Sequence, residues 1–231
     1  INAIIEWGSD NVSIYTYFLL FIIYSFVGWV IEIITEYYHH KRFVNRGFLI
    51  GPYCPIYGAA SVVMILFLNK YIDDPIALFV MALVICSIIE YLASYVMEKL
   101  FNARWWDYSN NKFNINGRIC LETMIPFGFG GLLLMYFINP FVVKVLSYVP
   151  TDLLKIIAII LFLLFLMDCF ISFKIILGFK KVTFKQERDN TAEITNKVKE
   201  TLIKKSKLNK RLINSFPNLR VRKRKTKKRN K

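Results

Sequence analysis

Long runs of apolar residues, separated by short polar segments, fill most of the first 180 positions of the chain. A helix needs about 20 mainly apolar residues to cross the hydrocarbon core of a bilayer, with a lower limit of about 17. Five runs meet this length or come close to it, and we therefore predict an all-α bundle of about five membrane-spanning helices. The expected spans are residues 14–38, 52–68, 75–98, 119–138 and 152–178.

Proline and glycine indicate where these helices begin or bend. Pro52 and Pro75 stand at the start of the second and third runs, where a missing backbone N–H costs little. In the fourth run Pro126 is followed closely by several glycines, so we expect a kink or a local break there. The segment after residue 138 begins with Asn-Pro, and we expect it to form a separate interfacial helix.

Basic residues gather at one set of helix ends. The loops after the first and third runs are rich in Lys and Arg, whereas the opposite ends hold only Lys70, Lys144 and Lys155 beside several acids. Positively charged loops tend to remain in the cytoplasm. We therefore expect a multi-pass protein of the cell membrane with its N-terminus outside and its C-terminus inside.

Charge divides the chain into two units, a transmembrane domain over residues 1–180 and a basic cytoplasmic tail over residues 181–231. The net charge is +15, and residues 180–231 alone hold 20 Lys or Arg against 4 Asp or Glu. We expect the tail to be partly amphipathic helix or disordered. A basic segment beside a membrane is typical of binding to anionic lipid headgroups. Contact with RNA or the ribosome is the alternative.

Charged side chains inside or beside the apolar runs are the candidates for a functional site. Such a residue costs about 2.5–3.5 kcal/mol at the bilayer centre on insertion scales, so it needs a partner or a purpose. With the expected topology these residues surround a polar chamber that faces the cytoplasm. The candidates for substrate or ion binding are Glu32, Glu36, Arg46, Glu90, Glu98, Arg104, Arg118, Glu122 and Asp168.

These charges permit two interpretations. They can form structural Glu–Arg pairs, as buried charges usually do. Alternatively, one or two acids bind a cation or proton, or the arginines bind an anionic headgroup or substrate. The motifs GxSxG, HExxH and the phosphate-binding GK[ST] loop are absent, so we assign no catalytic residue. Cys and His residues lack metal-site spacing, we predict no metal site, and the question of a cofactor stays open.

A weak internal repeat relates the first two helical hairpins. VIE, ending at Glu32, and IIE, ending at Glu90, each lead into a loop with Asn, Gly and Arg and then into a helix with early Pro and Gly. Both hairpins point the same way, as in a parallel repeat. Chance similarity is the alternative, because Pro and Gly are common in membrane helices. In such a repeat Glu32 and Glu90 match, with Arg46 and Arg118 as matching partners.

Three stretches resemble a known family: NRGFLIGPYCPIYG, EYLASYVMEKLFNARWWDYS and FNINGRICLE. They are similar to the characteristic blocks of the CmpB-like family of bacterial membrane proteins, over roughly residues 15–150. The resemblance implies a multi-pass inner-membrane protein of the kind labelled type IV ABC-transporter permease, with an ATPase subunit or a second copy of the chain as partner. The chain departs from the family pattern after GRICL, where it reads ETMIPFGFGG.

Together these features favour a transporter-like or permease-like membrane protein with a polar site facing the cytoplasm. Two other functions remain open. One is a membrane-embedded enzyme that acts on a lipid or a lipid-linked substrate. The other is a non-catalytic membrane scaffold.

Overall fold

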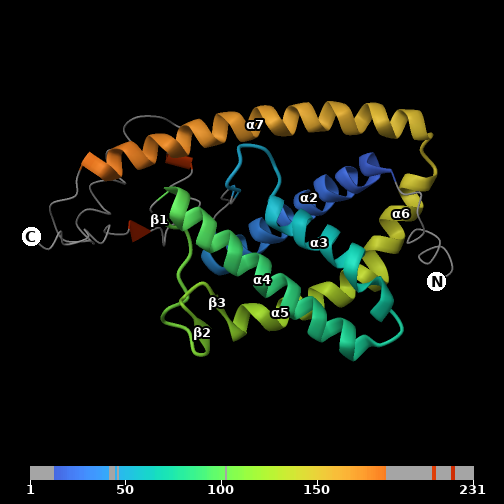
Figure 1. Ribbon diagram of the computed structural model, residues 1–231, viewed down its shortest axis with the longest axis horizontal. Helices are drawn as coiled ribbons and strands as arrows, with labels where there is room; N and C mark the ends of the chain where they lie inside the picture. The colour runs from blue at the N-terminus through green and yellow to red at the C-terminus, as the bar shows by residue number, and fades with distance from the viewer. Residues whose placement is uncertain are drawn as a thin grey trace, which may run out of the picture.

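The computed structural model describes residues 13–41, 45, 47–101, 103–185, 210–211 and 220–221. The chain is mainly helical, as predicted, and its long helices run between the two ends of the molecule (Figure 1). The helices are α2 (Ile14–His40), α3 (Pro55–Leu68), η1 (Asn69–Tyr71), α4 (Pro75–Phe101), α5 (Leu121–Leu133), the π-helical η2 (Leu134–Ile138), α6 (Asn139–Ser147) and α7 (Thr151–Lys185). The strands are β1 (Ala103–Arg104), β2 (Asn114–Ile115), β3 (Ile119–Cys120) and β4 (Arg220–Val221).

Four helices of the described residues are long and apolar enough to cross a membrane. They cover residues 14–38, 75–101, 121–147 and 151–174, and three of them agree with the expected first, third and fifth spans. The expected second span, with the short turn after it, is a shorter apolar helix over Pro55–Tyr71. The five-span topology, its orientation and the repeat therefore stay predictions.

The expected fourth span differs most from the structure. Instead of ending at residue 138, the helix runs on through η2 and α6 to Ser147, so the separate interfacial helix was wrong. Pro140 lacks an N–H and its ring clashes with the preceding turn of a regular α-helix. The π-helical turn directly before it provides the irregularity that lets the helix continue.

Helices α2 and α3 pack closely where α3 begins. A Cβ atom added at Gly58 would overlap the Ser25 side chain and the Phe21 carbonyl, so only glycine fits there. Farther along the bundle, α2, α3, α4 and the π-helical turn share an apolar core. Its buried members include Leu20, Tyr24, Met64, Leu68, Leu78, Ala82, Leu134 and Met135.

The connection between α2 and α3 turns back along the bundle before α3 begins. The backbone N–H of Cys54, the residue that precedes α3, donates to the Ser25 carbonyl at 2.9 Å. The part of α2 from Ser25 to His40 is roughly 22 Å long at about 1.5 Å per residue. Helix α3 therefore starts deep beside α2, and residues 47–54 form a non-helical segment within the bundle, which we call the inner segment.

Two short pieces of the basic tail lie against the remainder of the chain. Strand β4 pairs antiparallel with β1, with Arg220 opposite Arg104. Arg211 contacts the inner segment through hydrogen bonds described below. Most of the stretch for which we predicted an amphipathic helix or disorder lies outside the described residues, and the domain boundary at residue 180 stays a prediction.

Candidate functional site

The connection between α4 and α5 folds into a compact hairpin that places Arg118. Strands β2 and β3 pair antiparallel, with Ile115 opposite Ile119. Gly117, in the turn between them, has φ +66°, a left-handed conformation that glycine adopts without strain. Any Cβ atom at this position would also meet the side chains of Arg104, Asp107 and Ser109. The hairpin therefore packs tightly against the polar residues of its own loop.

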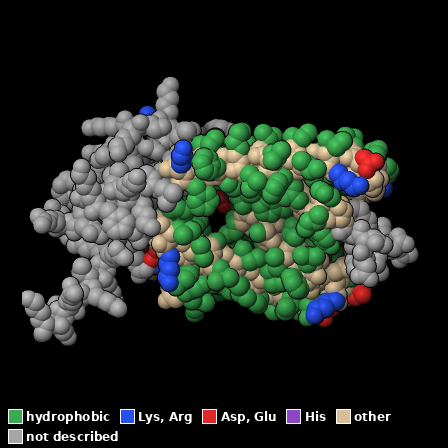
Figure 2. Space-filling view, turned by 45° about the horizontal axis from the view of Figure 1, so that its top comes forward, with side chains coloured by type: hydrophobic (Ala, Val, Ile, Leu, Met, Phe, Trp, Pro, Cys, Tyr) green, Lys and Arg blue, Asp and Glu red, His purple; other side chains and the backbone are tan. Residues whose placement is uncertain are grey.

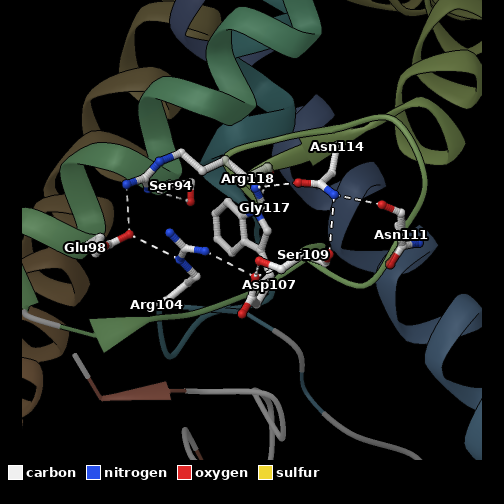
Figure 3. A network of polar contacts seen from close by, with 10 residues as sticks. Ser94, Glu98, Arg104, Asp107, Ser109, Asn111, Asn114, Gly117 and Arg118 are labelled. Atoms are coloured by element: carbon white, nitrogen blue, oxygen red, sulfur yellow. Dashed lines mark hydrogen bonds and ion pairs between the residues drawn. The ribbon is translucent and has the colours of Figure 1, made fainter. Parts of the chain in front are cut away.

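Two of the candidate arginines converge on one candidate acid (Figure 3). The Glu98 Oε2 atom lies 2.8 Å from Nη2 of Arg118 and 3.2 Å from Nε of Arg104. Arg104 also pairs with Asp107 at 3.2 Å, and Arg118 donates to the Ser94 hydroxyl at 3.2 Å. Glu98 and Arg118 are both buried. Among the described residues, each charge of this arginine network lies beside an opposite charge, which is the arrangement that the structural interpretation expects.

Asp107 closes the outer side of the arginine network. Burial by itself raises the pKa of this carboxyl, but hydrogen bonds from Ser109 and Arg104 outweigh it and hold the pKa below its usual value. The Ser109 hydroxyl donates to Asp107 Oδ1 at 2.5 Å, and the Ser109 backbone N–H donates to the same atom at 3.1 Å. Asp107 therefore stays ionised at neutral pH and keeps Arg104 in place.

Glu90 lies on the same face of α4 as Glu98 but forms no ion pair with any described residue. It is 6% exposed, and its Oε1 atom accepts a hydrogen bond from the Tyr108 hydroxyl at 3.3 Å. Its Oε2 atom has no hydrogen-bond partner within the described part of the chain. Arg118, which the repeat predicted as its partner, reaches Ser94 and Glu98 instead, one and two helical turns farther along α4.

Glu32 approaches Glu90 from α2. Its Oε1 atom accepts a hydrogen bond from the Tyr57 hydroxyl at 2.7 Å. The carboxylates of Glu32 and Glu90 are close enough to interact electrostatically, and the Tyr57 hydroxyl interacts with both. Burial first, and then the charges of Glu90 and Glu32, raise the pKa of Tyr108 well above its usual range, so this hydroxyl stays protonated. We call Glu32, Glu90, Tyr57 and Tyr108 the carboxylate pair site.

The tyrosines of this site were missed as functional residues. Tyr108 turns inward from the α4–α5 loop to Glu90, and Trp105 of the same loop is buried against Phe48 and Phe101. One signal in the sequence was available, because each glutamate of the repeat is followed by a loop and a tyrosine before or within the next helix.

Asp168 forms a separate cluster in α7, directly beside the inner segment. Its carboxylate accepts hydrogen bonds from the backbone N–H groups of Ile50 and Gly51 at 3.0 and 2.6 Å. The hydroxyls of Tyr53 and Ser172 donate to the same carboxylate at 2.6 and 2.8 Å. With four donors, Asp168 holds the inner segment in place.

Arg211 binds the other polar edge of the inner segment. Its guanidinium donates to the carbonyl oxygens of Gly47, Leu49 and Ile50. Lipid offers no hydrogen bonds, so non-helical backbone at membrane depth needs protein partners. Asp168 supplies acceptors and Arg211 supplies donors, and together they allow the segment to lie within the bundle.

The remaining candidates are less central. Glu36 is buried at the end of α2, where it is 4% exposed. Glu122 is exposed at the start of α5 and accepts a hydrogen bond from Asn111 at 2.6 Å. Arg46 lies outside the described residues. The structure thus brings Glu32 together with Glu90, and Glu98 with Arg104 and Arg118, while Asp168 and Glu122 stand apart.

Comparison with protein families identifies the relationship of this chain. The family model described as "Putative ABC-transporter type IV" matches residues 19–173, which is more than half of the chain. The chain belongs to this family. The resemblance seen in the sequence is confirmed, and the match extends through most of the membrane part of α7, beyond the expected limit near residue 150. Comparisons with curated proteins and with solved structures give no significant match.

The surface of the bundle agrees with a membrane protein of this family. Figure 2 shows a broad hydrophobic face, with Lys, Arg, Asp and Glu gathered toward its two ends. Large apolar side chains are exposed along α7, among them Ile160, Leu163 and Phe170. The same view shows a hollow near the middle of the face with acidic atoms visible inside it. The face is thus suited to lipid, and it is interrupted at one place by a polar interior.

Proposed function

We propose that the protein is the membrane-embedded, permease-like subunit of a transporter, and that its polar site lies where α3 begins. The inner segment carries this proposal. Non-helical backbone occurs at membrane depth only where protein or a cavity surrounds it, and transporters place binding sites at such interrupted helices. Here the inner segment brings the first turn of α3, with Tyr57, directly to Glu32 of α2.

The arrangement of charges supports transport over the other two functions. An enzyme that acts on anionic lipid headgroups would use unengaged cationic groups, but the two described arginines of the site, Arg104 and Arg118, are both engaged by Glu98. A purely structural bundle would pair all of its buried acids, yet one carboxylate oxygen of Glu90 lacks a partner among the described residues. Family membership adds an ATPase subunit as the proposed partner and the cytoplasmic membrane of a bacterium as the proposed location.

Water access to the carboxylate pair site tests this proposal. The four native cysteines are first replaced by serine, and single cysteines are then introduced as Ser87→Cys or Leu78→Cys. Both positions are buried, at 5% and 0% exposure, but Leu78 lies in the apolar core whereas Ser87 lies one turn from Glu90.

A transporter opens its site to water from one side or the other as it works. We therefore expect Ser87→Cys to react with a membrane-impermeant thiol reagent in native membranes, from one side at least, and Leu78→Cys to stay unreactive. If both cysteines resist the reagent from both sides, the site is sealed, and the scaffold function replaces transport.

A further inference from the structure

Three buried side-chain oxygens lack a hydrogen-bond partner within the described residues: Ser25 Oγ, Ser87 Oγ and Glu90 Oε2. All three residues are more than nine-tenths buried. Buried polar atoms are almost always hydrogen-bonded, so each exception calls for an explanation, and an absent ligand is one. Ser87 and Glu90 lie three residues apart and share one face of α4, which is directed into the bundle. The unsatisfied oxygens of α4 therefore converge on one place.

The surroundings of Glu90 favour a small cation. A second carboxylate, Glu32, lies within electrostatic range, and two carboxylates that share a buried site do not both stay ionised without compensation. Among the described residues, the other titratable groups shown to interact with the pair are the hydroxyls of Tyr57 and Tyr108 and the thiol of Cys86. Cys54 and Cys120 lie beside these tyrosines, and none of the five side chains is basic.

We propose that Glu90, with Ser87 beside it, binds a monovalent cation, either a proton or Na⁺, and that Glu32 supplies the neighbouring negative charge. This inference rests on the proposed function, in that the cation would bind within the polar site proposed for the transporter. Carboxylate and hydroxyl oxygens are hard ligands that suit both ions. In the proton case the Glu90 carboxylate takes one proton from water and becomes a neutral acid. In the sodium case the carboxylate stays ionised and the ion neutralises it.

Thermal unfolding of the purified full-length chain tests the site without any transport assay. The melting temperature is measured from mildly acidic to mildly alkaline pH, at constant ionic strength, in choline chloride and in sodium chloride. A group that holds its proton more tightly in the folded protein stabilises the fold at low pH, and this contribution is lost as pH rises through its folded pKa. We therefore expect the wild-type protein to lose stability as pH rises in choline.

Sodium separates the two ions. If Na⁺ replaces the proton, sodium chloride restores the melting temperature at alkaline pH, whereas coincident curves in the two salts assign the site to the proton. In either case we expect the melting temperature of Glu90→Gln, which carries a permanently neutral amide, to lose its dependence on pH and sodium. The matched control is Glu122→Gln, because Glu122 is exposed and bonded to Asn111, and it is expected to keep the wild-type response.

Identical responses of the wild-type protein and Glu90→Gln to pH and to sodium would overturn the inference. If Glu90→Gln does not fold, Ser87→Ala serves instead, and a wild-type pH and sodium response in that variant counts against the site. The outcomes also separate the two proposals. A reactive Ser87→Cys without any Glu90-dependent response keeps the transporter and removes the cation site. A Glu90-dependent response together with an unreactive Ser87→Cys keeps the cation site and removes the transporter.

Discussion

At the scale of single residues, α4 places two buried glutamates in opposite situations. Glu98 accepts from two arginines, whereas Glu90 accepts from one tyrosine hydroxyl and keeps one oxygen unsatisfied within the described part of the chain. The two residues lie eight positions apart on one face of the same helix. Their difference therefore arises from the α4–α5 hairpin, which delivers Arg118 to Glu98 and Tyr108 to Glu90.

Removing Arg118 tests whether the arginine network is structural. Losing one partner of a buried ion pair costs about 3–5 kcal/mol, because the other charge stays buried without compensation. Arg104 also contacts Glu98, so we expect Arg118→Gln to fall at the lower end of this range, measured by thermal or denaturant unfolding. Adding Glu98→Gln should recover part of the loss.

An exposed ion pair provides the control for this cycle. Lys155 and Asp152 form a pair at 3.2 Å with side chains that are 50% and 89% exposed. Surface pairs contribute about 0–1 kcal/mol, so Lys155→Gln should change stability little. If the double variant is simply the sum of the two single variants, Arg118 and Glu98 do not interact as the geometry indicates.

At the scale of helices, the apolar runs predicted the positions of the helices well and their irregularities poorly. The runs located α2, α4 and α7 because a long apolar stretch can be identified from the local sequence, without knowledge of its tertiary contacts. The depth at which α3 begins depends on hydrogen bonds that the inner segment donates to Asp168 and accepts from Arg211, and both residues lie more than a hundred positions away. The arginines and acids of the site were predicted as a group. The predicted pairing of Glu90 with Arg118 was wrong, because the fold of the hairpin around Gly117 directs Arg118 to Glu98.

The packing of α2 on α3 provides a prediction at this scale. Gly58→Val would push a branched side chain into Ser25 and the Phe21 carbonyl, and overpacking typically costs about 1–3 kcal/mol. Gly130→Ala is the matched control, because a Cβ atom there meets nothing within 4 Å. Alanine at an unstrained helical position usually stabilises by about 0.4–1 kcal/mol. We expect a lower melting temperature for Gly58→Val only, and equal effects would show that α3 does not pack on α2 as described.

At the scale of the whole molecule, one end of the bundle carries the α2–α3 connection, the α4–α5 hairpin and the described pieces of the tail (Figure 1). The other end carries the α3–α4 turn and the connection from α6 to α7. In the five-span prediction the loops after the first and third spans lie on the same side of the membrane as the tail, and this arrangement requires α3 to cross the membrane together with the inner segment. The orientation therefore depends on a helix that is by itself too short to span.

Cysteine labelling of intact cells tests the orientation. Single cysteines at Asp73 and Pro150, at the end without the hairpin, should react with an impermeant reagent added outside. Cysteines at Asn110 and in the tail should react only after the membrane is opened. All of these positions except those in the tail lie in loops or turns of the described chain, so side-chain burial does not obscure the result. External labelling at Asn110 would reverse the orientation and place the carboxylate pair site toward the outside.

The π-helical turn before Pro140 has a consequence for the angular phase of the helix. A π-helical turn holds one more residue than an α-helical turn. Because an α-helix has about 3.6 residues per turn, this extra residue rotates all later side chains by about 100° around the helix axis. This rotation sets the direction of Asn139, whose side-chain oxygen accepts the Tyr24 hydroxyl at 2.8 Å. Removing one exposed residue of the turn, such as Phe137, would restore a regular helix but would rotate α6 away from α2. Deleting one residue from this helix therefore changes the direction of every side chain that follows, whereas substituting a residue on its outer face does not.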